Sequence, residues 1–333
     1  MKKILLLAFI AIQTIVAQDK LKVVVLLPES ANNKDKGKAF LDVFGGIQRE
    51  LGDDYVVSKV VNSGDNSKTA QVIDSEKPHA LVVMENSSID VVKEFQKKEA
   101  NQATPVFATM ALQLESSAQD VKNTCGVKLE VPAFTIFSNL KYISKQPFEN
   151  ILVFYLKDFD KDIKKAIEMV QKEQLKLNAI CVDCGFDGEM SEKEIAKKMK
   201  SEYEKAKDEN KADVLWMLGD NRLLAQKSMA DFWMPKIWSK KVPTIAPLAE
   251  MVDPKSPSGK MIGGLMALGA DYPELGKQIS DQVRRVLEDK EETSAIGFED
   301  IISVQGVLNQ KKADKIDWVI NPDNVSRMKK IYE

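Results

Sequence analysis

The chain has 333 residues, with 48 lysines and arginines against 50 aspartates and glutamates and a net charge of −2. This balance gives no basic face of the kind that nucleic-acid-binding domains present, so we expect no nucleic-acid partner. The length exceeds the roughly 250–300 residues at which single cores stop growing, and it indicates two lobes.

The N-terminus has the order of a secretory signal peptide. Met1-Lys2-Lys3 is the charged start, Ile4 to Ile12 is the apolar stretch, and Ala17 is the small residue that closes the pattern. We therefore expect residues 1–17 to be a signal peptide and the protein to be periplasmic or secreted. The apolar stretch is shorter than the roughly 20 residues of a membrane span, although an uncleaved anchor is the alternative.

Short apolar strands alternate with amphipathic helices in the first part of the chain. This alternation is typical of a parallel sheet with helices on both faces, and it predicts one doubly wound α/β lobe. The predicted strands are Val23–Leu27, Tyr55–Val61, Ala80–Met84 and Pro105–Ala108, and the predicted helices are Gly37–Glu50, Ser67–Ser75 and Ile89–Glu99.

The same alternation continues in a second lobe that begins near Pro132. Apolar residues at helical spacing mark three helices, and we interpret them as core positions. The predicted strands are Ile151–Leu156, Asn178–Val182, Val214–Leu218, Thr244–Ala246 and Ile262–Leu268; the helices carry Ile163 to Leu175, Ile195 to Tyr203, and Ala225 to Ile237.

Two strands end in acidic helix starts. Asp271 stands where an N-cap belongs, Glu274 completes a capping box with it, and Pro273 suits the first turn. Asp220, followed by Asn221, repeats this design after the strand predicted at Val214–Leu218. We expect both acidic strand ends to face one cleft.

Several segments together resemble the type I periplasmic solute-binding proteins, in particular the ABC-transporter substrate-binding family with members that bind tryptophan and other aromatic amino acids. The resemblance implies two doubly wound parallel-sheet lobes joined by a multi-crossing hinge, with an N-terminal lobe of residues 18–131 plus 269–295 and a C-terminal lobe of residues 132–268 plus 296–333. The segments that carry it are Pro28–Phe44, Thr104–Gln113, Asn123–Val127, Ala212–Asn221, Val242–Pro247, Gly269–Gly276 and Trp318–Asn321.

Ligands of open parallel sheets bind beyond the carboxyl ends of the strands. Asp220 and Asp271 suit a ligand ammonium, with which a carboxylate makes a charge-assisted hydrogen bond, although each can instead cap its helix. Asn86 and Ser87 can likewise be a helix start, and the aromatic side chains can simply pack. The expected ligand-binding residues are Glu29, Ser30, Asn86, Ser87, Thr109, Phe159, Asp220, Asn221, Asp271 and Tyr272.

Little in the sequence supports catalysis, a metal or a cofactor. His79 is the only histidine, so any Ser-His-Asp arrangement would have to include it, and no phosphate-binding glycine loop occurs. Cys181 and Cys184 form a Cys-x-x-Cys sequence at a strand end. A loop follows it, and zinc ligands are few, so a local disulfide or two ordinary thiols are favoured over a redox or metal site.

We therefore expect a monomeric, non-enzymatic protein without a cofactor that closes around a small molecule. As the resemblance implies, it would present this molecule to an ABC transporter permease in the membrane. A periplasmic sensor with a membrane receptor is one alternative, and a hydrolase that uses aspartate and glutamate in the same cleft is another.

The mature protein should begin at or near Gln18, because Ala17 closes the signal pattern. N-terminal sequencing of the exported protein checks this expectation. Membrane-bound material that retains Met1 would show instead that the segment is an anchor.

Overall fold

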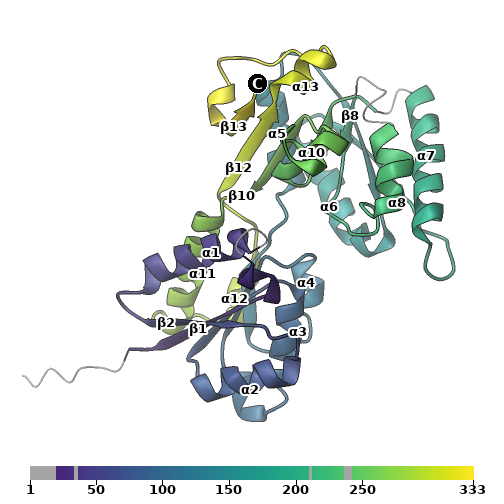
Figure 1. Cartoon of the computed structure of the whole chain (residues 1–333). Helices are drawn as coiled ribbons and strands as arrows, with labels where there is room; N and C mark the ends of the chain where they lie inside the picture. The colour runs from purple at the N-terminus through teal and green to yellow at the C-terminus, as the bar shows by residue number, and fades with distance from the viewer. Residues whose placement is uncertain (1–19, 34–36, 210–211, 236–241) are drawn as a thin grey trace, which may run out of the picture.

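The computed structural model describes residues 20–33, 37–209, 212–235 and 242–333. The predicted signal peptide and Ile237 lie outside the described residues. Two lobes stand one above the other, and the chain crosses between them near the middle of the molecule (Figure 1). Within the described ranges, no helix combines the length and the apolar character needed to cross a membrane.

The first lobe has a six-stranded parallel sheet in the order β11-β5-β4-β3-β1-β2. Helices cover both faces, so Val23 and Val25 of β1 are buried on one side and Val24 on the other. The strands are β1 Lys22–Leu27, β2 Val56–Val61, β3 Ala80–Met84, β4 Val106–Thr109, β5 Thr124–Val127 and β11 Phe298–Glu299; the helices are α1 Lys38–Leu51 and α11 Tyr272–Leu287 on one face, α2 Asn66–Glu76, α3 Asn86–Phe95 and α4 Leu114–Ser117 on the other, with α12 Thr293–Ile296 beside β5.

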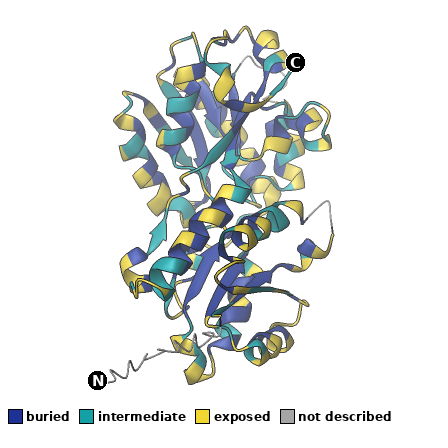
Figure 2. Ribbon diagram, turned by 90° about the vertical axis from the view of Figure 1, so that its left-hand side faces the viewer, coloured by how far each residue is buried: buried dark blue, intermediate teal, exposed yellow. Residues whose placement is uncertain are grey.

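The second lobe has a seven-stranded sheet in the order β13-β12-β10-β9-β8-β6-β7. β10 and β12 are antiparallel, and the other neighbouring strands are parallel. Figure 2 shows the strands of both sheets buried between their helices. The elements are β6 Asn150–Tyr155, β7 Lys176–Cys181, β8 Val214–Trp216, β9 Thr244–Ala246, β10 Met266–Ala270, β12 Val304–Asn309, β13 Met328–Tyr332, α5 Ala133–Ile143, α6 Asp160–Gln171, α7 Glu192–Asp208, α8 Gln226–Ser228, α10 Pro257–Ile262 and α13 Gln310–Lys315.

The predicted fold class of two α/β lobes is confirmed, but the strand predicted at Ile262–Leu268 was wrong at its start. Ile262 ends α10, which Ser256 caps by accepting a hydrogen bond from Gly259 N. Gly263 then ends this helix with a φ of 58°, a conformation that favours glycine. The strand begins only at Met266. Apolar content alone did not distinguish the last helical turn from the strand.

The third predicted helix of the second lobe is also less regular than its apolar spacing indicated. α8 lasts only from Gln226 to Ser228 and continues as a π-helix, Met229–Trp233. Phe232 and Trp233 are buried there, and Trp233 Nε1 donates a hydrogen bond to Leu223 O at 2.7 Å. The predicted core positions Phe232 and Trp233 are therefore correct, whereas the uninterrupted α-helix is not.

β11 belongs to the sheet of the first lobe, although we expected residues 296–333 in the second. Gly126 N donates to Gly297 O at 3.0 Å, and Lys128 N donates to Glu299 O at 2.9 Å. Arg285 of α11 adds ion pairs to Glu291 and Glu299, both at 2.8 Å. The chain therefore crosses back to the second lobe only after Glu299.

α1 and α11 pack with their backbones in contact. A Cβ atom on Gly46 would overlap Pro273 O, and one on Gly276 would overlap Val43 O and crowd Ile47 N. Glycine is required at both positions because the helices approach this closely. The contact holds α11 against α1 from its first turn.

Replacing Gly46 with alanine should lower the free energy of unfolding by about 1–3 kcal/mol, since the added methyl must push α11 away. Gly45→Ala is the matched control, because a Cβ at Gly45 meets nothing within 4 Å. Alanine is the better helix former, so this control should be neutral or stabilising by up to about 1 kcal/mol. Urea denaturation of both variants measures the difference. Equal stabilities would contradict the close packing of α1 on α11.

Candidate functional site

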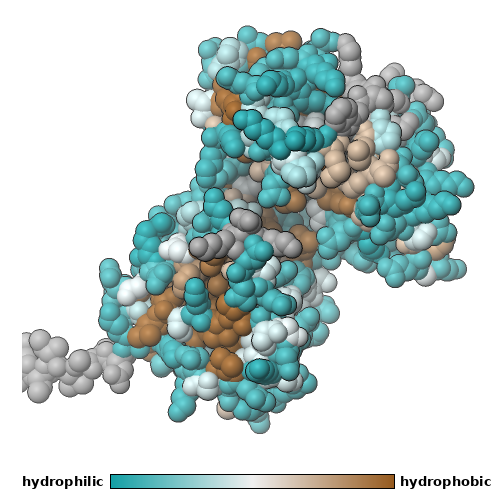
Figure 3. Space-filling model, in the orientation of Figure 1, coloured by the Kyte–Doolittle hydropathy of each residue, from teal (hydrophilic) through white to brown (hydrophobic). Residues whose placement is uncertain are grey.

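The candidate site is the gap between the lobes. The short 3₁₀ turn Glu29–Asn32 follows β1, and α4 follows β4, and both lie at the end of the first lobe nearest the second (Figure 1). α6 follows β6 on the opposite side of the gap. Figure 3 shows the molecule hollowed here, with apolar residues along the hollow. The carboxyl ends of both sheets thus meet at one place, as expected for a ligand cleft.

On the first lobe, the predicted residues differ in their access to the gap. Glu29 is exposed and Ser30 is half-buried, so both remain available to a ligand. Thr109 is fully buried, and its hydroxyl donates to Val127 O at 3.0 Å. The structure therefore places Thr109 inside the sheet and not at the surface of the gap.

Asn86 begins α3, but its side chain does not cap that helix. Its Nδ2 atom donates to Leu112 O at 3.0 Å and to Ser117 Oγ at 2.7 Å, while its Oδ1 atom accepts from Leu112 N at 2.9 Å. The neighbouring Ser87 is exposed. Asn86 is therefore the residue that holds the loop between β4 and α4 in place.

Strained backbone gathers at this edge of the first sheet. Glu85, Met110 and Gln113 have φ angles of 74°, 54° and 50°, in a region that residues with a Cβ seldom occupy. Such strain persists only where surrounding contacts impose it, and it concentrates at binding sites and other functional sites. The hydrogen bonds of Asn86 are such contacts for this loop.

On the second lobe, Asp220 shapes a turn. Its Oδ1 atom accepts hydrogen bonds from Arg222 N at 2.9 Å and Leu223 N at 2.8 Å, while Asn221 is exposed. Asp220 therefore does not cap a helix, because α8 begins only at Gln226 with Ala225 as its N-cap. Phe159 is half-buried and packs against the core of this lobe.

One charged residue beside the gap, Arg222, was missed in our set of predicted contacts. The Arg222 guanidinium donates to Asp158 Oδ2 at 2.8 Å and joins two strand ends of the second lobe. Arg222 is the only arginine between Arg49 and Arg284, a signal that the sequence did offer. A guanidinium is also the group best suited to bind a carboxylate with two hydrogen bonds.

At the hinge, the predicted capping box is absent. Asp271 precedes α11, but its carboxylate accepts no hydrogen bond from the helix, and within the described ranges no other hydrogen bond to it is found. Its backbone N–H donates to Ser303 O at 3.1 Å, which joins two crossings of the hinge. The half-buried carboxylate of Asp271 is therefore left for another partner.

Charged residues of both lobes act on the hydroxyl of Tyr272. Burial raises the pKa of its hydroxyl, and the charges of Glu250 from the second lobe and Asp42 from the first raise it further. The ring itself packs against the core of the first lobe. Tyr272 thus supplies an apolar surface and a neutral hydroxyl at the junction of the lobes.

Ion pairs span the gap beside the hinge. Glu115 of α4 lies 3.1 Å from Lys161 and 3.7 Å from Lys165, both on α6 of the second lobe. It also lies 3.6 Å from Lys128 of the first crossing, which pairs with Asp300 at 2.6 Å. These partly exposed pairs are individually weak, but together they connect both lobes with two crossings.

Glu130 of the first crossing was also missed. The residue is exposed at the surface. The surrounding protein nevertheless displaces part of the water around the carboxyl and so raises its pKa, and the negative charge of Asp162 raises this pKa further. The N–H of Gln113, which donates to Glu130 Oε1 at 2.8 Å, opposes this rise. Glu130 is thus an acidic group of raised pKa on the first crossing, hydrogen-bonded to the residue that precedes α4.

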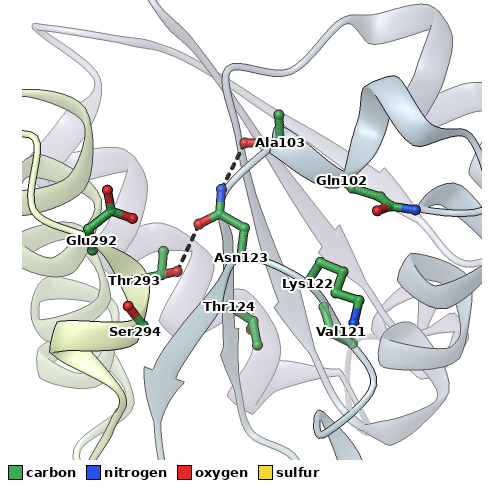
Figure 4. Close-up of a pocket in the computed structure, with 9 residues that line it drawn as sticks. All are labelled: Gln102, Ala103, Val121, Lys122, Asn123, Thr124, Glu292, Thr293 and Ser294. Carbon is green, nitrogen blue, oxygen red and sulfur yellow. Dashed lines mark hydrogen bonds between the residues drawn. The ribbon is translucent and has the colours of Figure 1, made fainter.

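A hollow of about 610 Å³ lies elsewhere, between the start of β5 and α12 (Figure 4). Its polar groups already bind one another: Asn123 accepts from Thr293 Oγ1 and donates to Ala103 O, both at 2.7 Å. The start of β5 is the amino end of a strand, opposite the edge where ligands of such sheets bind. We therefore do not assign the ligand site to this hollow.

The cysteine pair forms a disulfide bond between Cys181 and Cys184. With Asp183 these residues have the spacing of metal ligands. Their sulfur atoms are bonded to each other, however, and a metal needs them as free thiolates. In this oxidised form the group does not fit a metal.

Comparison with solved structures gives the fold a name. The chain is similar to a ligand-free, open substrate-binding protein with adhesive properties from Clostridium difficile, with a TM-score of 0.62 and 15% identity over 94% of this chain and 99% of that one. It is similar to an ABC domain in complex with L-Trp from Streptococcus pneumonia, with a TM-score of 0.57 and 16% identity over 94% of this chain and 100% of that one. The chain has the type I periplasmic binding protein fold.

An arabinose-binding protein from Geobacillus stearothermophilus shares this periplasmic binding protein fold, with a TM-score of 0.51 and 11% identity over 90% of this chain and 99% of that one. No protein-family model and no curated protein matches the sequence. At these identities the comparison establishes the architecture, and the predicted resemblance in fold is confirmed.

Asn86→Ala should lower the free energy of unfolding by about 1–3 kcal/mol, because it removes three hydrogen bonds and leaves Leu112 without its partner. Ser87→Ala is the control at the neighbouring exposed position, and it should change stability by less than about 0.5 kcal/mol. Chemical denaturation of the two variants provides the comparison. If both behave like the wild type, Asn86 does not hold the loop.

Proposed function

We propose that this protein is a solute-binding protein of an ABC importer that acts in the periplasm or outside the cell and binds a small amine-bearing molecule between its lobes. The proposal is supported by the type I periplasmic binding protein fold and by the open gap between the carboxyl ends of the two sheets. A membrane permease is the partner that would receive the ligand.

The observation that carries the proposed ligand class is the carboxylate of Asp271. It is half-buried at the hinge, and no hydrogen bond to it is found in the described part of the chain. A carboxylate removed from water without a partner is unfavourable, and an ammonium group of a ligand satisfies it with a strong charge-assisted hydrogen bond. Arg222 offers a matching site for a ligand carboxylate on the second lobe.

Apolar residues near strand ends indicate that the ligand also has an apolar part. Leu112 follows β4 and is 36% exposed, and Leu248 follows β9 and is 48% exposed. Both stand at carboxyl ends of strands, where a ligand binds in this architecture. Together with the ring of Tyr272, they favour a molecule with both a charged end and an apolar end, such as an amino acid.

Binding in this arrangement works through closure. A ligand that contacts Asp271 at the hinge and residues of both lobes binds the closed form more tightly than the open form. It shifts the population by this difference in affinity alone. The carboxylate of Asp271 and the ion pair of Arg222 with Asp158 would then be the polar contacts that determine which ligand binds.

The correct ligand at about 100 times its dissociation constant should stabilise the fold by about 2.7 kcal/mol. A thermal-shift panel of amino acids, other amines and sugars should therefore give a rise of several degrees for an amine-bearing compound. Sugars belong in the panel because the arabinose-binding protein shares the fold. A response to sugars alone would reject the amine, and no response in a broad panel would reject solute binding.

Asp271→Asn should weaken binding of the compound identified in the panel by about 2 kcal/mol, roughly thirtyfold, because the ligand ammonium loses its counter-charge. Stability should hardly change, since Asp271 makes no capping bond. Asp220→Asn is the matched control: an amide oxygen still accepts from Arg222 N and Leu223 N, so we expect near-normal affinity and stability. Calorimetric titration of both variants decides. Wild-type affinity in Asp271→Asn would remove this carboxylate from the site.

A further inference from the structure

The turn that follows β7 holds a reactive group that ligand binding does not use. A disulfide bond joins Cys181, the last residue of β7, to Cys184, and their Cα atoms are 5.5 Å apart. Cys184 is exposed and Cys181 is half-buried. A thiol in solution therefore reaches the sulfur of Cys184 without any opening of the lobe.

This bond does little for the stability of the whole chain. A disulfide stabilises a protein mainly by restricting the unfolded state, and the effect grows with the length of the loop that it closes. Only Val182 and Asp183 lie between these two cysteines. Exposed disulfides of low structural value are the ones that respond to the redox state of their surroundings.

Asp183 connects the bond to the neighbouring strand end. Its side chain is only 3% exposed, and its Oδ1 atom accepts a hydrogen bond from Lys157 N at 2.7 Å. Cys181 Sγ lies 3.6 Å from the same oxygen. A disulfide sulfur carries no hydrogen, so the oxygen is left to Lys157. Asp183 lies within the small loop that the disulfide closes, so reduction removes the covalent link that holds this carboxylate against Lys157 N.

The Asp183 turn is hydrogen-bonded to two neighbouring segments of the second lobe. Lys157 begins the 3₁₀ turn Lys157–Phe159, which carries Asp158 and its ion pair with Arg222. Phe186 is bound on the other side, where its backbone N–H donates to Asp183 O at 3.1 Å. A short path of hydrogen bonds thus connects the disulfide with Asp158 and its ion pair to Arg222.

We propose that Cys181–Cys184 is a redox-responsive bond that a dithiol reductant opens in the folded protein, and that its reduction releases the turn Lys157–Phe159 from Asp183. One thiolate of the reductant attacks Cys184 Sγ, the Sγ–Sγ bond breaks, and Cys181 leaves as a thiolate that takes a proton. The second thiol of the reductant then displaces Cys184 and closes the reductant's own disulfide. Two electrons pass to the cysteines, and both end as thiols.

The third cysteine provides an internal control. Cys125 is fully buried, and burial raises the pKa of its thiol to about 12, so it does not react while the chain is folded. Maleimide labelling of the native protein therefore reports on Cys181 and Cys184 alone. The oxidised protein should take up no label, and the protein treated with dithiothreitol should take up two, both in the peptide that contains β7.

Hydrogen exchange measures the second half of the proposal without any ligand. The amide of Lys157 should exchange at least about tenfold faster after reduction, because it loses the Asp183 acceptor for part of the time. The double variant Cys181→Ser with Cys184→Ser should show the same rise without reductant. Asp183→Ala should show it with the disulfide intact. The amides of β1, in the other lobe, should not change in any of these proteins.

Two results would overturn the proposal. The first is a bond that dithiothreitol opens only when the protein unfolds, seen as labelling of Cys125 together with the other two cysteines. The second is unchanged exchange at Lys157 in both the reduced protein and the double serine variant. Neither result depends on which molecule the protein binds, so either result would leave the proposed solute-binding function untouched.

Discussion

Gly46 and Gly276 bring the backbones of α1 and α11 so close that a methyl group fits at neither position. α11 is the helix that the chain inserts into the first lobe between two crossings of the hinge. Its first residue is Tyr272, and Asp271 comes directly before it. The contact of the two glycines therefore helps to determine where the carboxylate and the ring stand in the gap.

The other end of α11 is fastened just as firmly. Arg285 pairs with Glu291 and Glu299, and Gln282 donates to Gly126 O at 3.1 Å and to Glu299 at 2.9 Å. These bonds tie α11 to β5 and β11, the strands that lead into the first and third crossings. All the crossings thus leave the first lobe from one block of elements that these bonds connect.

The sequence predicted most of the architecture because it depends on patterns that are local. Runs such as Val23–Leu27 are apolar throughout because both faces of the sheet are covered. Side-chain roles were harder to predict. Asp271 and Asp220 follow strands in the same way, yet among the described residues the first carboxylate accepts no hydrogen bond while the second shapes a turn, and Asn86 binds a loop 26 residues away. The partners of Asn86 lie in a distant loop that a local pattern does not contain, whereas Asp220 shapes a turn because α8 begins only at Gln226.

The antiparallel pairing of β10 with β12 has a mechanical consequence. β10 enters the hinge where β12 leaves it, and the hydrogen bond from Asp271 N to Ser303 O extends their ladder into the hinge. Two chain segments that are hydrogen-bonded side by side bend across the face of their ladder more easily than they shear within its plane. A movement between the lobes that keeps this pair intact would therefore have to bend it across its face.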